Sequence, residues 1–267
     1  LEYPLHATSF DEALVVELLT SIYQTELRVD PSKCAVVCCV NTGQDSSWLN
    51  RVFFGHFKVP GLLVGDSSVY ALNAAGNETG VVVDIGSRST TIVPIYKGFV
   101  AEHAIQSYPI GGQQITDYLL QLLQVDPSSA IDVVQKMKED LGYVTDDVES
   151  EEIKQKFKPK SPFLLSNGTQ IQVGREAFEC CELLFNSDAN KSKTNMKESY
   201  QFVNRGLQQA IVETVLSCDK QIQDELLMNV VLCGGSSLFL GIEKRLRLEI
   251  SAELERKKQS KRVYVIC

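Results

Sequence analysis

The chain has 267 residues, of which 44% are hydrophobic and 22% are charged, a composition typical of a globular protein with one large or two small domains. Its formal net charge of −8 argues against a surface that binds nucleic acid mainly through phosphate contacts. No apolar run reaches about 18 residues, and the first residues lack the charged-then-apolar pattern of a signal peptide. We therefore expect a soluble protein of the cytoplasm or nucleus, with no membrane contact and no sequence-specific nucleic-acid binding.

The eight cysteines do not follow the spacing of a disulfide framework or a zinc site. Cys38-Cys39 and Cys180-Cys181 are adjacent pairs, there is no CxxC motif, and the three histidines are dispersed. We expect buried, reduced thiols, as in a cytosolic or nuclear protein.

The first part of the chain alternates between helical and strand patterns. Leucine, valine and isoleucine recur at helical spacing over residues 10–25, after an acidic start at Asp11 and Glu12. The apolar run AVVCCV is typical of a buried strand. In chain order, the patterns predict a helix over residues 10–25, a strand over 34–40, a helix over 44–57, a strand over 62–64 and a helix over 67–75.

Residues 80–105 predict an antiparallel meander. A short β-branched run over residues 80–83 ends at Asp84, a tight turn follows, and further β-rich runs cover residues 90–96 and 99–105. An acidic residue at a strand end, followed by glycine and hydroxylic residues, can hold a hydrated metal ion and face a phosphate. An ordinary hairpin shows the same pattern, so both interpretations stay open.

The second half predicts more helices than strands. Gly111-Gly112 precedes a strongly amphipathic segment, and Asn167-Gly168 is a hairpin turn signal. The charge-rich residues 145–162 and the polar residues 186–198 are expected to be mobile. The remaining predictions are helices over residues 131–141, 202–217 and 241–256, and strands over residues 229–233 and 262–267.

A meander followed by a glycine-rich strand-to-helix turn resembles the architecture of actin, hexokinase and the heat-shock-70 ATPases. The resemblance to the actin family is closer, since it covers nearly all of the chain in the family's order and approximate spacing. The matching segments are LEYPL, QTELRVDP, TGVVVDIG, VPIYKGF, HAI, GGQQITDYLLQLL, MKEDLGYV, NGTQIQVGREAF and VVLCGGSSLFLGIEKRL. The resemblance implies an α/β, actin-like fold, with mixed sheets flanked by helices, in a divergent family member.

In the actin family a nucleotide lies between two halves, held by two phosphate loops and a purine pocket. The second phosphate loop has the pattern Asp-Ser-Gly-Asp-Gly, and this chain keeps only Asp84 and Gly86 while it has Ser87 and Arg88 in place of the second Asp and Gly. The resemblance implies that this loop contacts phosphate and that Asp84 is a ligand of Mg²⁺. A hairpin that has lost this role is the alternative.

Other segments resemble the ribose and purine contacts of actins. Lys138-Glu139 matches the family's Lys-Glu pair, Gly112 matches a glycine near the ribose, and Gly234-Gly235-Ser236 with Phe239 matches the Gly-Gly-Thr and aromatic residue at the purine. Without the resemblance, a Lys-Glu pair on a helix would be an exposed ion pair. The full set of expected nucleotide-binding residues is Asp84, Gly86, Ser87, Arg88, Ser89, Gly112, Lys138, Glu139, Gly234, Gly235, Ser236 and Phe239.

Arg88 has two physically reasonable orientations. The guanidinium either points toward the nucleotide and pairs with phosphate oxygens, or it turns to solvent or to an acidic residue such as Asp84. We expect the second orientation.

The catalytic residues of actins are replaced in this chain. Actins place a Gln on the hinge helix and a His on the strand after the second phosphate loop, where they orient the attacking water. The matching residues here are Ser67 and Thr91, and neither is a general base near neutral pH. By the resemblance, the chain also begins after the first phosphate loop and ends before the usual C-terminus of the family.

We therefore expect a non-catalytic structural subunit of a larger complex, either chromatin-remodelling or cytoskeletal, with weak or degenerate binding of ATP or ADP with Mg²⁺. Its expected partners are other protein subunits, with actin or another actin-related protein among them. The alternative is an active actin-like ATPase that polymerises. Residues 1–75 are expected to form part of one large subdomain, residues 76–110 and 203–267 the second, and residues 111–202 a smaller inserted one.

Overall fold

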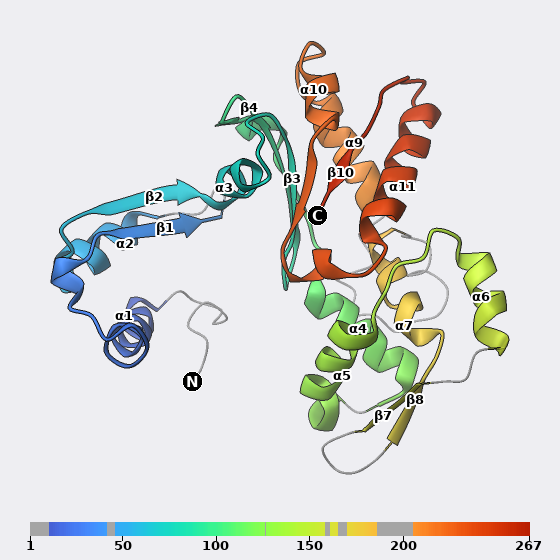
Figure 1. Cartoon of the computed structure of the whole chain (residues 1–267), viewed down its shortest axis with the longest axis horizontal. Coiled ribbons are helices and arrows are strands. Elements are labelled where there is room, and N and C mark those ends of the chain that lie inside the picture. Colours follow the sequence, from blue (N-terminus) through green and yellow to red (C-terminus); the bar gives the residue numbers. More distant parts are fainter. Residues whose placement is uncertain (1–10, 42–45, 126, 158–160, 165–169, 186–204) are drawn as a thin grey trace. The chain divides into compact units, whose positions relative to one another are not determined.

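The computed structural model describes residues 11–41, 46–125, 127–157, 161–164, 170–185 and 205–267 (Figure 1). The chain divides into two compact units, Leu1–Tyr70 and Ala71–Cys267. The predicted finer division, with residues 111–202 as a separate subdomain, stays a prediction.

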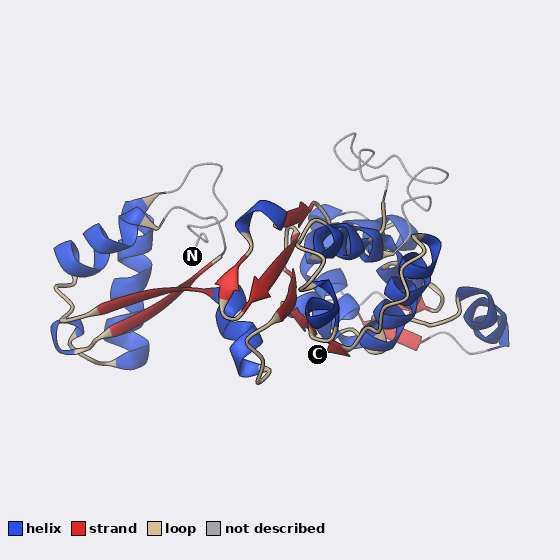
Figure 2. Ribbon diagram, turned by 90° about the horizontal axis from the view of Figure 1, so that it is seen from above, coloured by secondary structure: helices blue, strands red, loops and turns tan. Residues whose placement is uncertain are grey.

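The first unit packs helices against a pair of parallel strands. β1 (Val36–Val40) and β2 (Leu62–Asp66) lie side by side (Figures 1 and 2). α1 (Glu12–Ser21) continues into a π-helical turn over Ile22–Leu27, and α2 (Ser47–Asn50) continues into another over Arg51–His56. The core of this unit consists of the buried side chains of Tyr23, Leu49, Val52, Phe53, Phe57 and Val59. Within the described residues, the helices and strands predicted for this part of the chain are confirmed. β1 is not the buried strand that was expected, because its residues alternate between half-buried and exposed and Val37 is 65% exposed.

α3 (Ser67–Ala74) follows β2 directly and carries the chain from the first unit into the second. Its Leu72 is fully buried. The side chain of Leu72 lies against Gly80, the first residue of β3, where a Cβ atom would come within 2.9 Å of it. The helix therefore packs on the start of the strand that leads to the candidate site.

The second unit is organised around a six-stranded mixed sheet, with the order β10-β9-β3-β4-β5 and with β6 also paired to β4. β3 (Gly80–Ile85) lies in the middle, parallel to β9 (Val230–Cys233) and antiparallel to β4 (Thr90–Tyr96). Val81, Val82 and Val83 are all fully buried. A continuous β-branched run is typical of a strand that is covered on both faces. β10 (Val265–Ile266) adds a parallel edge strand next to β9.

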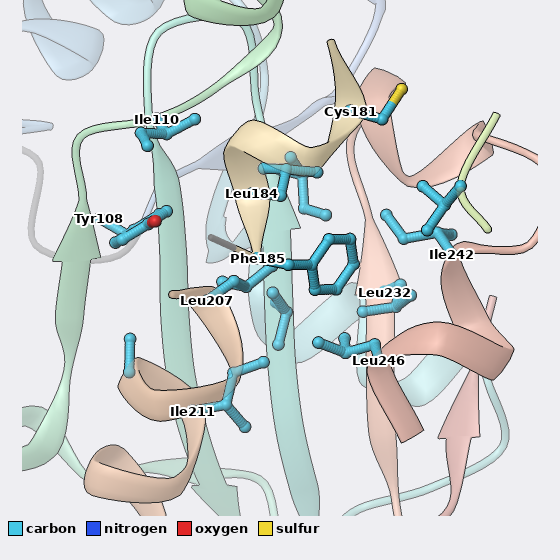
Figure 3. Close-up of a cluster of buried hydrophobic side chains, with 14 of the residues drawn as sticks. Tyr108, Ile110, Cys181, Leu184, Phe185, Leu207, Ile211, Leu232, Ile242 and Leu246 are labelled. Carbon is cyan, nitrogen blue, oxygen red and sulfur yellow. The ribbon is translucent and has the colours of Figure 1, made fainter. Parts of the chain in front are cut away.

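Helices complete the core of the second unit. α9 (Leu207–Leu216), α10 (Gln223–Leu227) and α11 (Ile242–Arg256) pack near the sheet, and α11 packs on α9. Figure 3 shows side chains of α9, β9 and α11 gathered around Phe185. α4 (Gly112–Leu123) packs on α5 (Pro127–Leu141), and α7 (Glu176–Glu179) packs on α4.

The third strand of the meander is shorter than the predicted range of residues 99–105. β5 covers only Phe99–Val100, a 3-10 turn follows at Glu102–Ala104, and β6 (Gln106–Tyr108) returns to the other end of β4. The backbone N–H of Ala104 donates to the carbonyl of Ala101 at 3.0 Å, which closes this turn. The final strand is also shorter than the predicted range of 262–267, since residues 262–264 and 267 lie outside β10.

The prediction of a mobile excursion over residues 145–162 is wrong for most of that range. Val148–Phe157 forms α6, and Ser161–Leu164 forms β7, which pairs with β8 (Gln170–Val173) as the predicted hairpin. Asp147 accepts a hydrogen bond from the backbone N–H of Ser150, and the Tyr143 hydroxyl donates to Glu151 at 2.8 Å. Acidic residues in the first turn and lysines in the last complement the helix dipole. The predicted loop over residues 186–198 lies outside the described residues.

All eight cysteines are free, as predicted. Cys180, Cys181 and Cys218 are buried, whereas Cys39 and Cys267 are exposed, contrary to the expectation of uniformly buried thiols. None of the helices in the described ranges combines the length and the apolar character that crossing a bilayer requires.

Candidate functional site

A cavity of about 380 Å³ lies in the second unit. It is bounded by the turn after β3, the first turns of α4, the second half of α5 and the turn after β9. This volume lies in the range of small-molecule sites, about 300–1,000 Å³. The lining residues are Gly86, Ser87, Gly112, Gln113, Thr116, Gln135, Lys138, Glu139, Gly235, Ser236, Leu238 and Phe239.

The turn after β3 closes one side of the cavity. The backbone N–H of Gly86 donates to the carbonyl of Ser89 at 3.1 Å, which folds the chain back into β4. The carbonyl oxygens of Gly86 and Ser87 accept hydrogen bonds from the backbone N–H groups of Gly112 and Gln113, at 2.9 and 2.6 Å. Two of the N–H groups that a helix N-terminus leaves without intrahelical partners are therefore bound by this turn.

Paired glycines let the turn and α4 approach each other closely. A Cβ atom at Gly111 would lie 2.5 Å from the carbonyl oxygen of Gly86 and 2.8 Å from the backbone nitrogen of Ser89. The N–H of Gly111 donates to the side-chain oxygen of Gln114 at 2.8 Å, which holds the start of the helix. The glycine pair is needed here because a side chain at Gly111 would separate the turn from the helix.

Lys138 connects α5 to the first turn of α4. Its ammonium group donates to the carbonyl oxygen of Gly112 at 2.9 Å and to the hydroxyl of Thr116 at 3.0 Å. The residue is only 6% exposed, and burial lowers the pKa of its ammonium group, while Glu139 acts in the opposite direction. Lys138 is therefore a buried cation that fixes the floor of the cavity.

Phe239 forms an apolar wall of the cavity. It is 7% exposed, and a Cβ atom at Gly142, just after α5, would lie 2.8 Å from its ring. The chain continues from β9 to Phe239 through a 3-10 turn over Gly235–Leu238. A flat apolar surface beside polar groups suits a planar heterocycle such as a purine.

Glu139 supplies a carboxylate at the rim. It is exposed, and its Oε1 accepts a hydrogen bond from the side-chain amide of Gln135, one turn earlier on α5, at 3.1 Å. Because both residues line the cavity, the amide holds the carboxylate beside it. The rim therefore offers acceptors to a ligand that carries hydroxyl or amine donors.

Several predicted site residues lie outside the cavity lining, namely Asp84, Arg88, Ser89 and Gly234. Gly234 has φ +87°, and a Cβ atom there would lie 2.4 Å from the carbonyl oxygen of Ile85 and 2.5 Å from a carboxylate oxygen of Asp84. It therefore lets β9 turn beside the end of β3, in a conformation that favours glycine. Arg88 is exposed.

Asp84 lies near the end of β3, outside the cavity lining. It is half-buried, and burial raises the pKa of its carboxyl group, which favours the neutral form. The neighbouring Cys233 has a pKa raised to about 12 by burial, with smaller effects of Asp84 and Cys267. Within the described ranges, no three His, Cys, Asp or Glu side chains come together to hold a metal ion. The assignment of Asp84 as a ligand of Mg²⁺ stays a prediction.

The positions that carry catalytic groups in actins lie outside the cavity lining. Thr91 stands opposite Asp84 in the β3–β4 pair and is half-buried. Ser67 begins α3, and its hydroxyl donates to the side-chain oxygen of Asn41 at 3.3 Å.

The structure adds lining residues that the sequence analysis missed: Gln113, Thr116, Gln135 and Leu238. Helical spacing could have identified two of them, since Thr116 lies four residues after Gly112 and Gln135 lies four residues before Glu139. Leu238 carries no such signal, because its place depends on the irregular turn after β9.

The cavity thus gathers a turn, two helices and a glycine-rich strand-to-helix connection around one polar and one apolar wall. Eight of the residues that the resemblance assigned to a nucleotide line it together: Gly86, Ser87, Gly112, Lys138, Glu139, Gly235, Ser236 and Phe239. A family model described as "Actin" matches residues 10–132 and 125–267, which is most of the sequence. The chain belongs to the actin family.

Proposed function

We propose that this protein is a non-catalytic subunit of a larger complex, either chromatin-remodelling or cytoskeletal, which binds ATP or ADP weakly in the cavity beside Phe239. The observation that carries the proposal is that one cavity brings together, from four separate segments, eight residues that the resemblance matched to nucleotide contacts of the family. Actin-family proteins commonly bind other proteins, and this supports a role within an assembly. Nucleotide binding in this cavity is equally compatible with a nuclear and with a cytoplasmic complex.

The residues fit the nucleoside end of an adenine nucleotide. The Phe239 ring would contact the purine, and the Glu139 carboxylate would accept hydrogen bonds from hydroxyl or amine groups. A Cβ atom at Gly112 would lie 3.0 Å from the Ser236 hydroxyl and 3.3 Å from the Lys138 ammonium group, so glycine keeps this part of the cavity open.

The replacement of both water-positioning residues supports a role without hydrolysis. The Thr91 hydroxyl cannot take a proton from water near neutral pH, and the same holds for Ser67. Water positioning is part of the barrier in phosphoryl transfer, so its loss leaves bound ATP intact. The nucleotide would then act as a structural ligand that stabilises the second unit.

Calorimetric titration with ADP and ATP tests the binding. We expect a dissociation constant between about 1 μM and 1 mM, and we expect Phe239→Ala to weaken it about tenfold, or roughly 1.4 kcal/mol. Phe99→Ala is the matched control, because Phe99 is 80% exposed and does not line the cavity. Equal affinity of the wild type and both variants would contradict the proposed site.

A phosphate-release assay on the same samples tests the absence of catalysis. We expect no release above that of a sample without protein at saturating ATP. Sustained turnover, together with a polymer pellet on sedimentation with magnesium and ATP, would instead establish the polymerising ATPase.

Purification of the tagged intact protein from cells, read by mass spectrometry, tests the assembly. A reproducible stoichiometric set of nuclear or of cytoskeletal subunits is expected. Elution as a lone monomer under mild conditions would contradict a subunit role.

A further inference from the structure

The segment that follows α5, residues 143–146, contacts the chain just before α11 through backbone atoms. The backbone N–H of Val144 donates to the carbonyl oxygen of Leu240 at 2.8 Å. Gly241 has φ +88°, and a Cβ atom there would lie 2.3 Å from the carbonyl oxygen of Val144, so this crossing requires glycine. The two segments therefore touch one residue away from Phe239, the apolar wall of the cavity.

This contact determines how close the apolar wall lies to α5. Phe239 lines the cavity, and a Cβ atom at Gly142 would lie 2.8 Å from its ring. Gly142 directly precedes the segment 143–146, and Leu240 directly follows Phe239. The distance between the ring and α5 therefore depends on how firmly the two segments are held together.

Arg245 connects α11 to the same segment through its side chain. Nη1 of the guanidinium donates to the carbonyl oxygen of Thr145 at 2.5 Å. Arg245 is buried, and its guanidinium lies over the ring of Phe185, 5.1 Å from the ring centroid. A hydrogen bond from a charged donor is stronger than one between neutral groups. This side chain therefore adds a second link beside the bond between Val144 and Leu240.

Glu182 fixes the orientation of the guanidinium. Its two carboxylate oxygens accept hydrogen bonds from Nη1 and Nη2 of Arg245, both at 3.2 Å, and the residue is only 7% exposed. Glu249, one turn further along α11, accepts from Nε at 2.9 Å. A planar guanidinium that is paired with both oxygens of one carboxylate is held in a fixed direction. The pair therefore directs Nη1 at the carbonyl oxygen of Thr145.

We propose that Arg245 is a positioning residue of the cavity. Held by Glu182, it binds the segment after α5 to α11 and so keeps the Phe239 ring where a planar base can contact it. This inference rests on the proposed function, because it concerns the ring that would contact the purine. It gives a side chain outside the cavity lining a share of the affinity for the base.

Calorimetric titration with ADP of the wild type, Arg245→Lys, Phe239→Ala and the double variant tests the inference. Lysine keeps the charge but lacks the planar fork, so it cannot bind Glu182 and the Thr145 carbonyl in the same geometry. We expect Arg245→Lys to weaken binding about fivefold in the wild type and less than about twofold in Phe239→Ala, because the ring on which it acts is then missing. An equal loss in both backgrounds would show a merely structural role and overturn the inference.

Arg247→Lys is the matched control, because Arg247 is exposed on the same helix and does not line the cavity. Its affinity for ADP should equal that of the wild type, and a loss as large as that in Arg245→Lys would contradict a specific role of Arg245. Binding with unchanged affinity in Arg245→Lys would overturn the inference alone. A wild type that binds no ADP would overturn the proposed function, and the inference with it.

Glu182→Gln provides a second test that keeps Arg245 and therefore also decides the question should Arg245→Lys not fold. It removes the charge that orients the guanidinium and leaves the size of the side chain unchanged. We expect faster hydrogen exchange of the Val144 amide in the ligand-free protein, together with ADP binding that is about threefold weaker. Unchanged exchange at Val144 would overturn the inference, whether or not ADP binds.

Discussion

At the scale of single residues, Lys138 holds the candidate site together. Its ammonium group donates two hydrogen bonds to α4, although burial lowers its pKa and so penalises its charged form. Hydrogen bonding by a charged group offsets the cost of removing that group from water. The lysine thus gives a charged donor to two buried oxygens, the Thr116 hydroxyl and the Gly112 carbonyl, and the carbonyl also accepts from that hydroxyl.

Lys138→Met should lower the free energy of unfolding by about 1–3 kcal/mol, because the Gly112 carbonyl and the Thr116 hydroxyl each lose a charged donor, although the Thr116 hydroxyl still donates to the Gly112 carbonyl. Urea denaturation followed by circular dichroism measures the change. Lys136→Met is the control, since Lys136 is exposed on the same helix. If both variants lose the same stability, the two hydrogen bonds do not contribute as described.

The glycines around the cavity differ in how much space surrounds them for a Cβ atom, and therefore in the expected effect of replacing them by alanine. Gly111→Ala should destabilise the protein by about 1–3 kcal/mol, since the new Cβ would meet backbone atoms of the turn after β3. Gly235→Ala should be nearly neutral, because no heavy atom lies within 4 Å of a Cβ there. Thermal unfolding of both variants checks the difference, and a neutral Gly111→Ala would mean that the turn and α4 are not in close contact.

Glu182 should give the stability a dependence on pH. It is 7% exposed, and burial raises the pKa of its carboxyl group above the ordinary 4.5, although its ion pair with Arg245 acts in the opposite direction. Between the two pKa values the folded chain binds more protons than the unfolded chain. The contribution of Glu182 to stability is therefore fully present below pH 4.5 and is lost as the pH rises through the raised value.

Urea denaturation of the wild type and Glu182→Gln across this pH range measures the effect. The stability of the wild type minus that of the variant should fall as the pH rises from 4.5 and then level off. A difference that rises with pH would show that the Arg245 pair, and not burial, determines the pKa.

At the scale of elements, hydrophobic patterns predicted most of the fold. α4, α11, β3 and the β7–β8 pair were all predicted, because each combines a clear period with a glycine, a turn signal or a β-branched run. The register of β3 and β4 follows from the tight turn between them.

Local sequence patterns did not predict the elements that are stabilised by residues distant in the chain. α6 reads as a charged loop, yet Tyr143 and Gln155 join Glu151 in one hydrogen-bonded group, and Arg175 pairs with Glu152 from the segment after β8. The return of β6 to β4 is likewise invisible locally, because it depends on pairing across the intervening 3-10 turn.

α6 should be sensitive to a single hydroxyl. Tyr143→Phe removes the bond that the tyrosine donates to Glu151 at 2.8 Å and the one that it accepts from Gln155 at 2.8 Å. We expect faster amide hydrogen exchange in residues 148–157, with a global loss of only about 1 kcal/mol. Unchanged exchange there would show that other contacts hold α6.

The resemblance predicted part of the cavity lining, and the assignment of these residues to a nucleotide stays a prediction. Lys138, Glu139 and Phe239 line the cavity as the resemblance implied. Asp84 and Arg88 do not, because the path of the turn after β3 is determined by its contacts with α4. Sequence similarity identifies which residues match, but only the packing of the turn decides which of their atoms face the cavity.

At the scale of the whole molecule, actin-family membership and an organised cavity in the second unit are consistent with a subunit that keeps a nucleotide as a structural part. Binding of a ligand to the folded state alone stabilises that state by mass action. Nucleotide bound in the cavity would therefore stabilise the folded second unit, without hydrolysis of ATP.

Amide hydrogen exchange with and without saturating ADP tests this account most directly. We expect protection to increase in the turn after β3, the first turns of α4, the second half of α5 and the segment from Gly235 to Phe239, which together line the cavity. Protection that is absent from all four segments, or confined to residues of the first unit, would contradict the account.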